Sequence, residues 1–170
     1  MKKNILLIAF FCGTMHCAFS QNTTDWSKFK WLIGEWTGEG GGKPGEGVGW
    51  FVLKEDLGGK VLVRTNHSEY PANNGKPAII HDDLMVLYTD YPGTPSKAIY
   101  FDNEGHTINY TISFTENTIT FLGEKIPNVP VFRLTYLRNE KDRVTVRFEM
   151  SRDGLTFMTY TEGRCKRKIN

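Results

Sequence analysis

Cysteine is scarce in this chain of 170 residues, and two of its three cysteines lie in a predicted leader. Loss of Cys12 and Cys17 with that leader would leave Cys165 alone. A lone thiol forms no internal disulfide, even in an oxidising compartment. The stability of the mature protein must therefore come from a hydrophobic core, which a chain of about 150 residues is long enough to supply.

The chain also lacks an apolar run of the ~20 residues that a membrane-spanning helix needs. Its first 20 residues instead have the three parts of a signal peptide. Lys2 and Lys3 form the positive part, residues 5–11 the apolar part, and Ala18-Phe19-Ser20 the cleavage site. We therefore predict an exported protein, periplasmic or secreted, with lipoprotein processing at a leader cysteine as the alternative.

The predicted mature chain has no excess of charge of either sign. The whole chain carries 21 basic and 19 acidic residues, a formal net charge of +2, and the predicted leader accounts for the difference through Lys2 and Lys3. A chain without net charge has no global field to attract nucleic acid or an anionic membrane. We therefore expect no nucleic-acid partner and no membrane span.

Motifs of metal and nucleophilic chemistry are absent as well: the chain has no H-x-H, HExxH, CxxC or G-x-S-x-G. Three convergent imidazoles could hold zinc or copper, or serve as a general base, but His67, His81 and His106 lack ligand spacing. We therefore favour two histidines at the barrel rim and one exposed histidine over a metal site. The carboxylates of Asp82-Asp83 and Asp102-x-Glu104 lie at expected turns, where capping is favoured over a glycosidase-like pair. We predict no catalytic residue, no metal site and no cofactor, because ligand spacing supports neither haem nor zinc.

What the chain does contain is a series of short segments in which apolar residues recur at every second position. A helical cap is expected near residues 26–33, and the period becomes two after Gly34. Strands at this spacing, with turn residues between them, favour an antiparallel barrel or sandwich. The expected strands are 35–40, 47–55, 60–68, 82–89, 97–102, 106–115, 118–123, 130–138, 143–151 and 155–166.

Three short turns are expected to fix the register of their hairpins, because a two-residue loop pairs the residues on either side of it. The expected cross-strand pairs are Trp50 with His67 across Gly58-Gly59, Phe114 with Ile119 across Glu116-Asn117, and Met150 with Phe157 across Asp153-Gly154. Each turn brings apolar or aromatic side chains together, and such consistency supports a meander of hairpins.

These patterns predict an all-β protein: an antiparallel, up-and-down, lipocalin-like β-barrel of about eight to ten strands with a short N-terminal helical cap. The expected organisation is a signal peptide over residues 1–20 and a single barrel domain over residues 21–170. A barrel of this size leaves room for side chains or one small ligand.

The motif Gly34-Glu35-Trp36, followed by a meander and a basic residue on the last strand, resembles the lipocalin and calycin barrels. In that family the tryptophan closes one barrel end beneath an arginine, which would be Arg164 or Arg167. Residues 100–106 resemble the corresponding run of uncharacterised bacterial barrels of the DUF1579 type.

Residues 34–40 also resemble the opening of nitrobindin-like haem barrels. Membership of that group would imply a haem-binding histidine near the C-terminus. This chain has no histidine after His106, which argues against haem.

We predict that the protein binds a small apolar or amphipathic molecule without catalytic turnover, because inward Trp and Tyr offer apolar surface with a polar group. The alternatives are a metal- or His/carboxylate-dependent enzyme in the barrel cavity and an envelope or stress scaffold. Ligand is expected to enter at a rim that carries His67 and His106. The sequence leaves the oligomeric state open. The expected ligand-binding residues are His67, His106, Trp36, Trp50, Tyr110, Tyr136 and Phe148.

Overall fold

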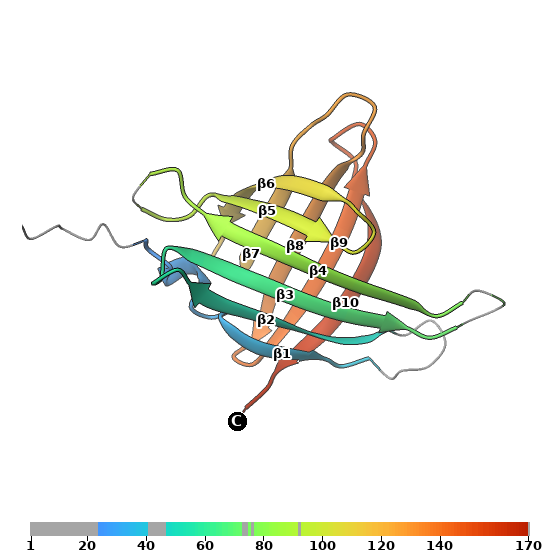
Figure 1. The fold of residues 1–170 in the computed structure, drawn as a ribbon, viewed down its shortest axis with the longest axis horizontal. Helices are drawn as coiled ribbons and strands as arrows, with labels where there is room; N and C mark the ends of the chain where they lie inside the picture. Colours follow the sequence, from blue (N-terminus) through green and yellow to red (C-terminus); the bar gives the residue numbers. More distant parts are fainter. Residues whose placement is uncertain (1–23, 41–46, 73–74, 76, 92, 170) are drawn as a thin grey trace, which may run out of the picture.

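Ten strands form one closed antiparallel barrel in a computed structural model that describes residues 24–40, 47–72, 75, 77–91 and 93–169 (Figure 1). Each strand pairs with its neighbours in the chain, and the first pairs with the last. A single 3-10 turn, η1 (Ser27–Phe29), precedes them. The strands are β1 (Gly34–Gly38), β2 (Val48–Asp56), β3 (Val61–Tyr70), β4 (Ile79–Tyr88), β5 (Lys97–Asp102), β6 (Thr107–Phe114), β7 (Thr118–Gly123), β8 (Val131–Glu140), β9 (Arg143–Ser151) and β10 (Met158–Arg167).

The predicted all-β, up-and-down barrel is therefore confirmed, with ten strands at the upper end of the expected number. Each observed strand coincides with one expected from the sequence, and the bounds differ by at most three residues. The predicted signal peptide, residues 1–20, lies outside the described residues, so cleavage and export stay predictions.

Two of the three predicted hairpin registers are confirmed. Trp50 lies opposite His67 in the β2–β3 hairpin, and Phe114 lies opposite Ile119 in the β6–β7 hairpin. The first turn contains three successive residues of positive φ, ending with Gly58 and Gly59. Glycine adopts this conformation without the steric cost that a side chain brings, which is why the pair marks a tight turn.

The third register is wrong by one residue: Met150 pairs with Met158. The side chain of Asp153 explains the difference, because its Oδ1 accepts hydrogen bonds from the amides of Leu155 and Thr156, both at 2.8 Å. An aspartate that binds the backbone ahead of it stabilises a local turn of its own. The loop is therefore wider than a two-residue turn.

Trp36 and Arg167 close the seam between β1 and β10. The indole is 1% exposed and donates a 2.8 Å hydrogen bond to the Leu32 carbonyl. Arg167 lies over its face, 4.3 Å from the ring centroid, and donates to the carbonyls of Trp31 and Ile33 at 2.6 and 2.7 Å. A guanidinium over an indole is a favourable cation–π contact. Of the two arginines considered from the sequence, the later one covers the tryptophan.

One end of the barrel carries η1 and the β2–β3, β4–β5, β6–β7 and β8–β9 turns (Figure 1). We call it the closed end, because buried side chains pack it. Phe29 of η1 is fully buried there and meets the ring of Phe114 edge-on, with centroids 5.2 Å apart. Burial of such side chains supplies the main stabilising free energy of the fold. The inward core residues are Phe51, Leu53, Leu62, Met85, Leu87, Ala98, Ile112, Ile119, Phe121 and Val144.

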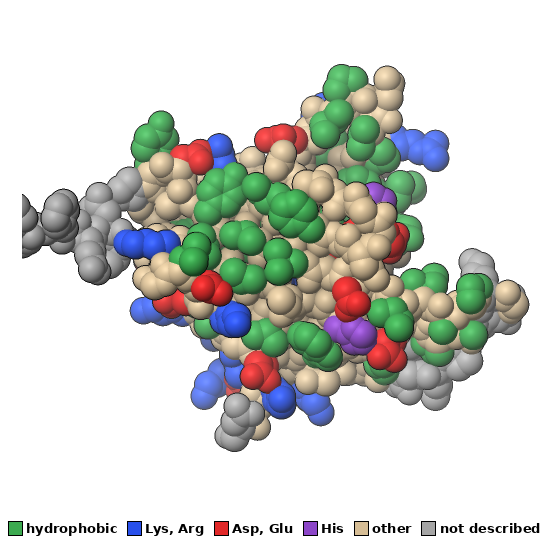
Figure 2. All heavy atoms as spheres, viewed as in Figure 1, with side chains coloured by type: hydrophobic (Ala, Val, Ile, Leu, Met, Phe, Trp, Pro, Cys, Tyr) green, Lys and Arg blue, Asp and Glu red, His purple; other side chains and the backbone are tan. Residues whose placement is uncertain are grey.

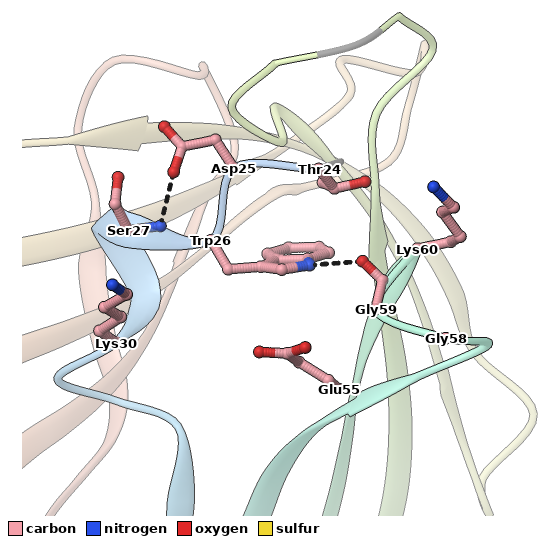
Figure 3. Close-up of a pocket in the computed structure, with 9 residues that line it drawn as sticks. All are labelled: Thr24, Asp25, Trp26, Ser27, Lys30, Glu55, Gly58, Gly59 and Lys60. Carbon is pink, nitrogen blue, oxygen red and sulfur yellow. Dashed lines mark hydrogen bonds between the residues drawn. The ribbon is translucent and has the colours of Figure 1, made fainter. Parts of the chain in front are cut away.

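A cleft of about 350 Å³ lies between η1 and the β2–β3 hairpin at the closed end (Figure 3). Trp26 reaches across to the hairpin, and its indole nitrogen donates a 2.9 Å hydrogen bond to the Gly59 carbonyl. The Asp25 carboxylate accepts from the Ser27 amide, also at 2.9 Å. The Trp26 contact fastens the N-terminal turn onto the hairpin, and the Asp25 contact stabilises the turn itself. The lining residues are Thr24, Asp25, Trp26, Ser27, Lys30, Glu55, Gly58, Gly59 and Lys60.

Candidate functional site

The opposite end of the barrel, which we call the open end, exposes side chains that point inward. Thr161 lies opposite Phe148 and Gly163 opposite Val146, and residues directly opposite each other share a face of the sheet. Phe148 and Val146 pack against the core, so this face is the inner one. Both β10 residues are nevertheless exposed, and a Cβ at Gly163 would have no neighbour within 4 Å. The inner wall is therefore accessible to solvent at this end.

The lining of the open end is apolar on one side and polar on the other. The apolar wall comes from β6, β8 and β9, where the rings of Phe132 and Phe148 stack with centroids 5.6 Å apart. Its partly buried members are Ile108, Phe132, Phe148 and Met150. The polar wall comes from β3, β4 and β5, and its inward residues are Asn66, Ser68, His81, Asp83, Tyr100 and Asp102.

His81 is the centre of the polar wall. Its Nε2 lies 3.0 Å from the Tyr100 hydroxyl and 3.5 Å from Asp83 Oδ2, and its Nδ1 lies 3.0 Å from Glu104 Oε1. Hydrogen bonding to Asp83 and then to Glu104 outweighs burial and raises the pKa of His81 to about 9. The imidazole is therefore protonated at neutral pH and donates from both nitrogens. The Tyr100 hydroxyl donates in turn to Asp102 Oδ2, at 3.2 Å.

Arg64 and Asp83 form a buried ion pair below this wall. Both residues are buried, and Arg64 Nη1 donates to Asp83 Oδ1. Burial alone would lower the pKa of Arg64, but the negative charge of Asp83 raises it, so the guanidinium stays charged. Its Cζ lies 5.6 Å from the ring centroid of Phe51 and 5.8 Å from that of Tyr136. The barrel thus carries a cation among aromatic rings at the floor of the open end.

Three buried polar atoms at this floor have no hydrogen-bond partner within the described part of the chain: Arg64 Nε, the Tyr110 hydroxyl and the Tyr136 hydroxyl. Burial raises the pKa of both tyrosines despite the nearby guanidinium, so both remain protonated. A buried polar group without a partner costs roughly 1–3 kcal/mol and requires a physical explanation.

The predicted interior residues lie partly where expected. Tyr110 and Tyr136 are buried inside the barrel, and Phe148 belongs to the apolar wall. Trp36 is also inside, but it packs at the closed end beneath Arg167. Whether any of them contacts a ligand stays a prediction.

His106 lies at the rim of the open end, beside the inward residue Asp102. This residue belongs to the turn between β5 and β6, its side chain is 62% exposed, and its Nδ1 lies 2.9 Å from Asp102 Oδ2. Asp102 Oδ1 also accepts from the backbone amide of His106, at 2.8 Å. The double contact holds the histidine beside the turn, at the rim of the open end.

Trp50 and His67 lie elsewhere than predicted: their pair is on the outer wall of the barrel. Trp50 is 46% exposed and stacks on His67 with centroids 5.9 Å apart. The imidazole is held between Asp82, at 2.7 Å from Nδ1, and Glu69, at 2.9 Å from Nε2. Hydrogen bonds to Glu69 and then Asp82 raise the pKa of His67. The interior is therefore not lined by Trp50.

The outer wall of β2–β5 is rich in apolar side chains, which gather over these strands in Figure 2. This explains the wrong assignment of faces: both faces of β2 and β3 carry apolar residues, so a period of two cannot distinguish the inner face. By register, the outward apolar residues are Val52, Val63, Leu84, Val86, Ile99 and Phe101.

The polar wall is the part of the site that sequence reasoning missed. His81 was expected in a loop and Asp83 at a turn, because the strand was predicted to begin at residue 82. In the structure β4 begins at Ile79, which places both residues within the strand and on its inner face. The alternation of Leu62 and Arg64 on one face of β3 was a usable signal, since it predicts a buried charge that needs a partner.

The described residues contain neither a cluster of metal-ligating side chains nor a membrane-spanning helix. No group of three or more His, Cys, Asp or Glu side chains there is arranged to hold a metal ion. No helix within the described ranges is long and apolar enough to cross a membrane. Burial raises the pKa of Cys165 to about 11, so this thiol is protonated at neutral pH and is a poor nucleophile.

Fold and site together define a closed ten-stranded, up-and-down antiparallel barrel that is packed at one end and accessible at the other. No protein-family model and no curated protein matches the sequence. Among solved structures, the crystal structure of Rv2717c from M. tuberculosis is similar, with a TM-score of 0.57 over 85% of this chain and 97% of that one. The two sequences are 17% identical, so the likeness establishes the fold alone.

Proposed function

We propose that the barrel binds a small amphipathic molecule at its open end, without chemical turnover. One observation carries this proposal: the inner wall of the open end is accessible at Thr161 and Gly163, and its lining is apolar on one side and polar on the other. Binding sites of this kind combine apolar lining with a few placed polar groups that orient the ligand.

The state of His81 argues against a general-base role for this residue in the His/carboxylate enzyme that the sequence left open. A general base needs a free lone pair near neutral pH. The pKa of His81 is raised to about 9, and both ring nitrogens face polar partners. A protonated imidazole in that position orients its neighbours and does not accept a proton.

The proposal includes the finer expectations from the sequence. The predicted leader supports a protein that acts outside the cytoplasm, where a binding barrel can capture a molecule from solution. The position of Trp36 beneath Arg167 supports the resemblance to lipocalin-like binding barrels.

Fluorescence titration with the uncharged probe N-phenyl-1-naphthylamine tests the proposal. Gly163→Leu places a side chain into the accessible interior, whereas the neighbouring Arg164→Leu places the same side chain outside. We expect Gly163→Leu to weaken probe binding by about tenfold or more, which corresponds to about 1.4 kcal/mol of lost binding free energy. Arg164→Leu should bind like the wild type.

Thermal unfolding of both variants verifies that they fold. Equal affinity of the two leucine variants would move the site away from the open end. Lack of probe binding by the wild-type protein would contradict the proposed function.

A further inference from the structure

The three unpartnered atoms at the floor belong to inward side chains that interact inside the barrel. Arg64 Cζ lies 5.8 Å from the ring centroid of Tyr136, and electrostatic coupling links Arg64 to both Tyr110 and Tyr136. The ring of Phe121 meets both tyrosine rings edge-on, with centroids 6.0 and 5.9 Å away. The two hydroxyls and the guanidinium therefore interact with one another electrostatically in the interior below the lining.

All three atoms can donate a hydrogen bond, and the guanidinium Nε–H can do nothing else. No acceptor within the described residues is available to them. An oxygen with two lone pairs satisfies at least two such donors at once, which a nitrogen donor or an apolar group cannot do. The floor is therefore complementary to an oxygen acceptor.

The carboxylates around the floor already outnumber the positive charges. Arg64 and protonated His81 both contact the carboxylate of Asp83. Asp102, which accepts from Tyr100, and Glu104 at the rim add two further carboxylates. A negatively charged ligand head next to the floor would find no free positive charge in a region of low dielectric, which is unfavourable. The head of the ligand should therefore carry no charge.

We propose that Arg64, Tyr110 and Tyr136 receive an uncharged oxygen, such as that of a ketone, ester or amide, at the leading end of an apolar ligand. This assignment rests on the proposed function and adds to it the chemical class of the ligand. None of the three atoms is exposed to solvent, so the ligand reaches them when a side chain of the floor rotates away.

Displacement of N-phenyl-1-naphthylamine by two ligands of equal chain length tests the assignment. At pH 7.5 we expect 2-dodecanone to bind at least about tenfold more tightly than dodecanoate, equivalent to about 1.4 kcal/mol. Tyr110→Phe and Tyr136→Phe should each weaken ketone binding about three- to tenfold, the effect of one lost hydrogen bond. Tyr91→Phe, at an exposed residue of the β4–β5 loop, is the matched control and should bind like the wild type.

Thermal unfolding supplies an independent readout. A buried hydroxyl without a partner does not stabilise the free protein, so both interior variants should unfold at the wild-type temperature or above it. A lower unfolding temperature in both would mean that a buried water already satisfies the hydroxyls, and it would overturn the assignment.

Stronger binding of dodecanoate, or unchanged ketone affinity in both interior variants, would also overturn the assignment while leaving the proposed function intact. Failure of the probe and of both ligands to bind would overturn the two together.

Discussion

His81 shows how a single side chain couples the open end to pH. Its imidazole is about three-quarters buried and is held by Asp83, Tyr100 and Glu104. The folded state raises its pKa to about 9, whereas an unfolded chain leaves it near the reference value of ~6.5. The protonated form is therefore favoured by folding.

We predict that His81→Gln removes part of the dependence of stability on pH. In the wild type, the contribution of His81 is fully present below pH ~6.5 and is lost as the pH rises to about 9. The contribution is about 1–3 kcal/mol, given the partial exposure of the ring. Urea unfolding at pH 6, 7.5 and 9 should show a difference between wild type and variant that shrinks as the pH rises.

His106→Gln controls for removal of an imidazole from the same end of the barrel. A difference between wild type and His81→Gln that stays constant from pH 6 to 9 would contradict the prediction.

At the scale of elements, the seam between β1 and β10 decides whether the sheet closes. β1 pairs with β10 over three residues, from Trp36 to Gly38, so few backbone hydrogen bonds hold these strands. Side chains make up for the short pairing: Trp36 stacks on Phe51 with centroids 5.8 Å apart, and Arg167 covers the indole. Closure matters because a sheet without edges resists pairing with other chains.

We predict that Trp36→Ala lowers the free energy of unfolding by about 3–5 kcal/mol, because it leaves a cavity beneath Arg167. Trp50→Ala is the matched control, since the same side chain is half-exposed on the outer wall. It should cost less than about 1 kcal/mol. Similar losses in both variants, measured by urea unfolding, would mean that the buried indole does not support the seam.

The hairpins show how far the sequence predicts the elements. The strands were predictable because period-two alternation and turn residues coincide along the chain. The β6–β7 register followed from its turn, whereas the β9–β10 register did not, because the Asp153 side chain builds a wider loop through contacts with Ser151, Leu155 and Thr156. Such contacts depend on side-chain geometry that alternation does not encode.

At the scale of the whole molecule, the interior is unevenly filled. Large apolar side chains pack the closed end, and the polar and apolar walls leave the open end accessible. Burial of apolar surface is concentrated in one half, so that half must supply most of the stability. The open half contributes less to stability, so its inner side chains can serve binding.

The candidate site was less predictable than the fold, for a reason that also belongs to this scale. Whether Trp50 and His81 lie inside or outside the barrel depends on which face of each strand turns inward. The sequence does not show this for β2–β5, because both faces of these strands carry apolar residues. Alternation within one strand is compatible with either face turning inward, and closure of the sheet determines which face does. Tyr110 and Phe148 were placed correctly because the outward residues of their strands are polar or charged.

The uneven filling predicts two classes of amide in hydrogen exchange of the free protein. Amides of buried closed-end residues, such as Leu62 and Leu87, should exchange through global unfolding. Amides at the open end, such as Thr161, should exchange through local opening and at least about tenfold faster. Saturation with N-phenyl-1-naphthylamine should narrow the difference in exchange rate between the two classes. A ligand that contacts both walls must dissociate before the open end opens locally, so its binding free energy adds to the free energy of local opening. Equal rates in the free protein would contradict the packed-and-open division, and an unchanged difference with bound probe would place the probe outside the open end.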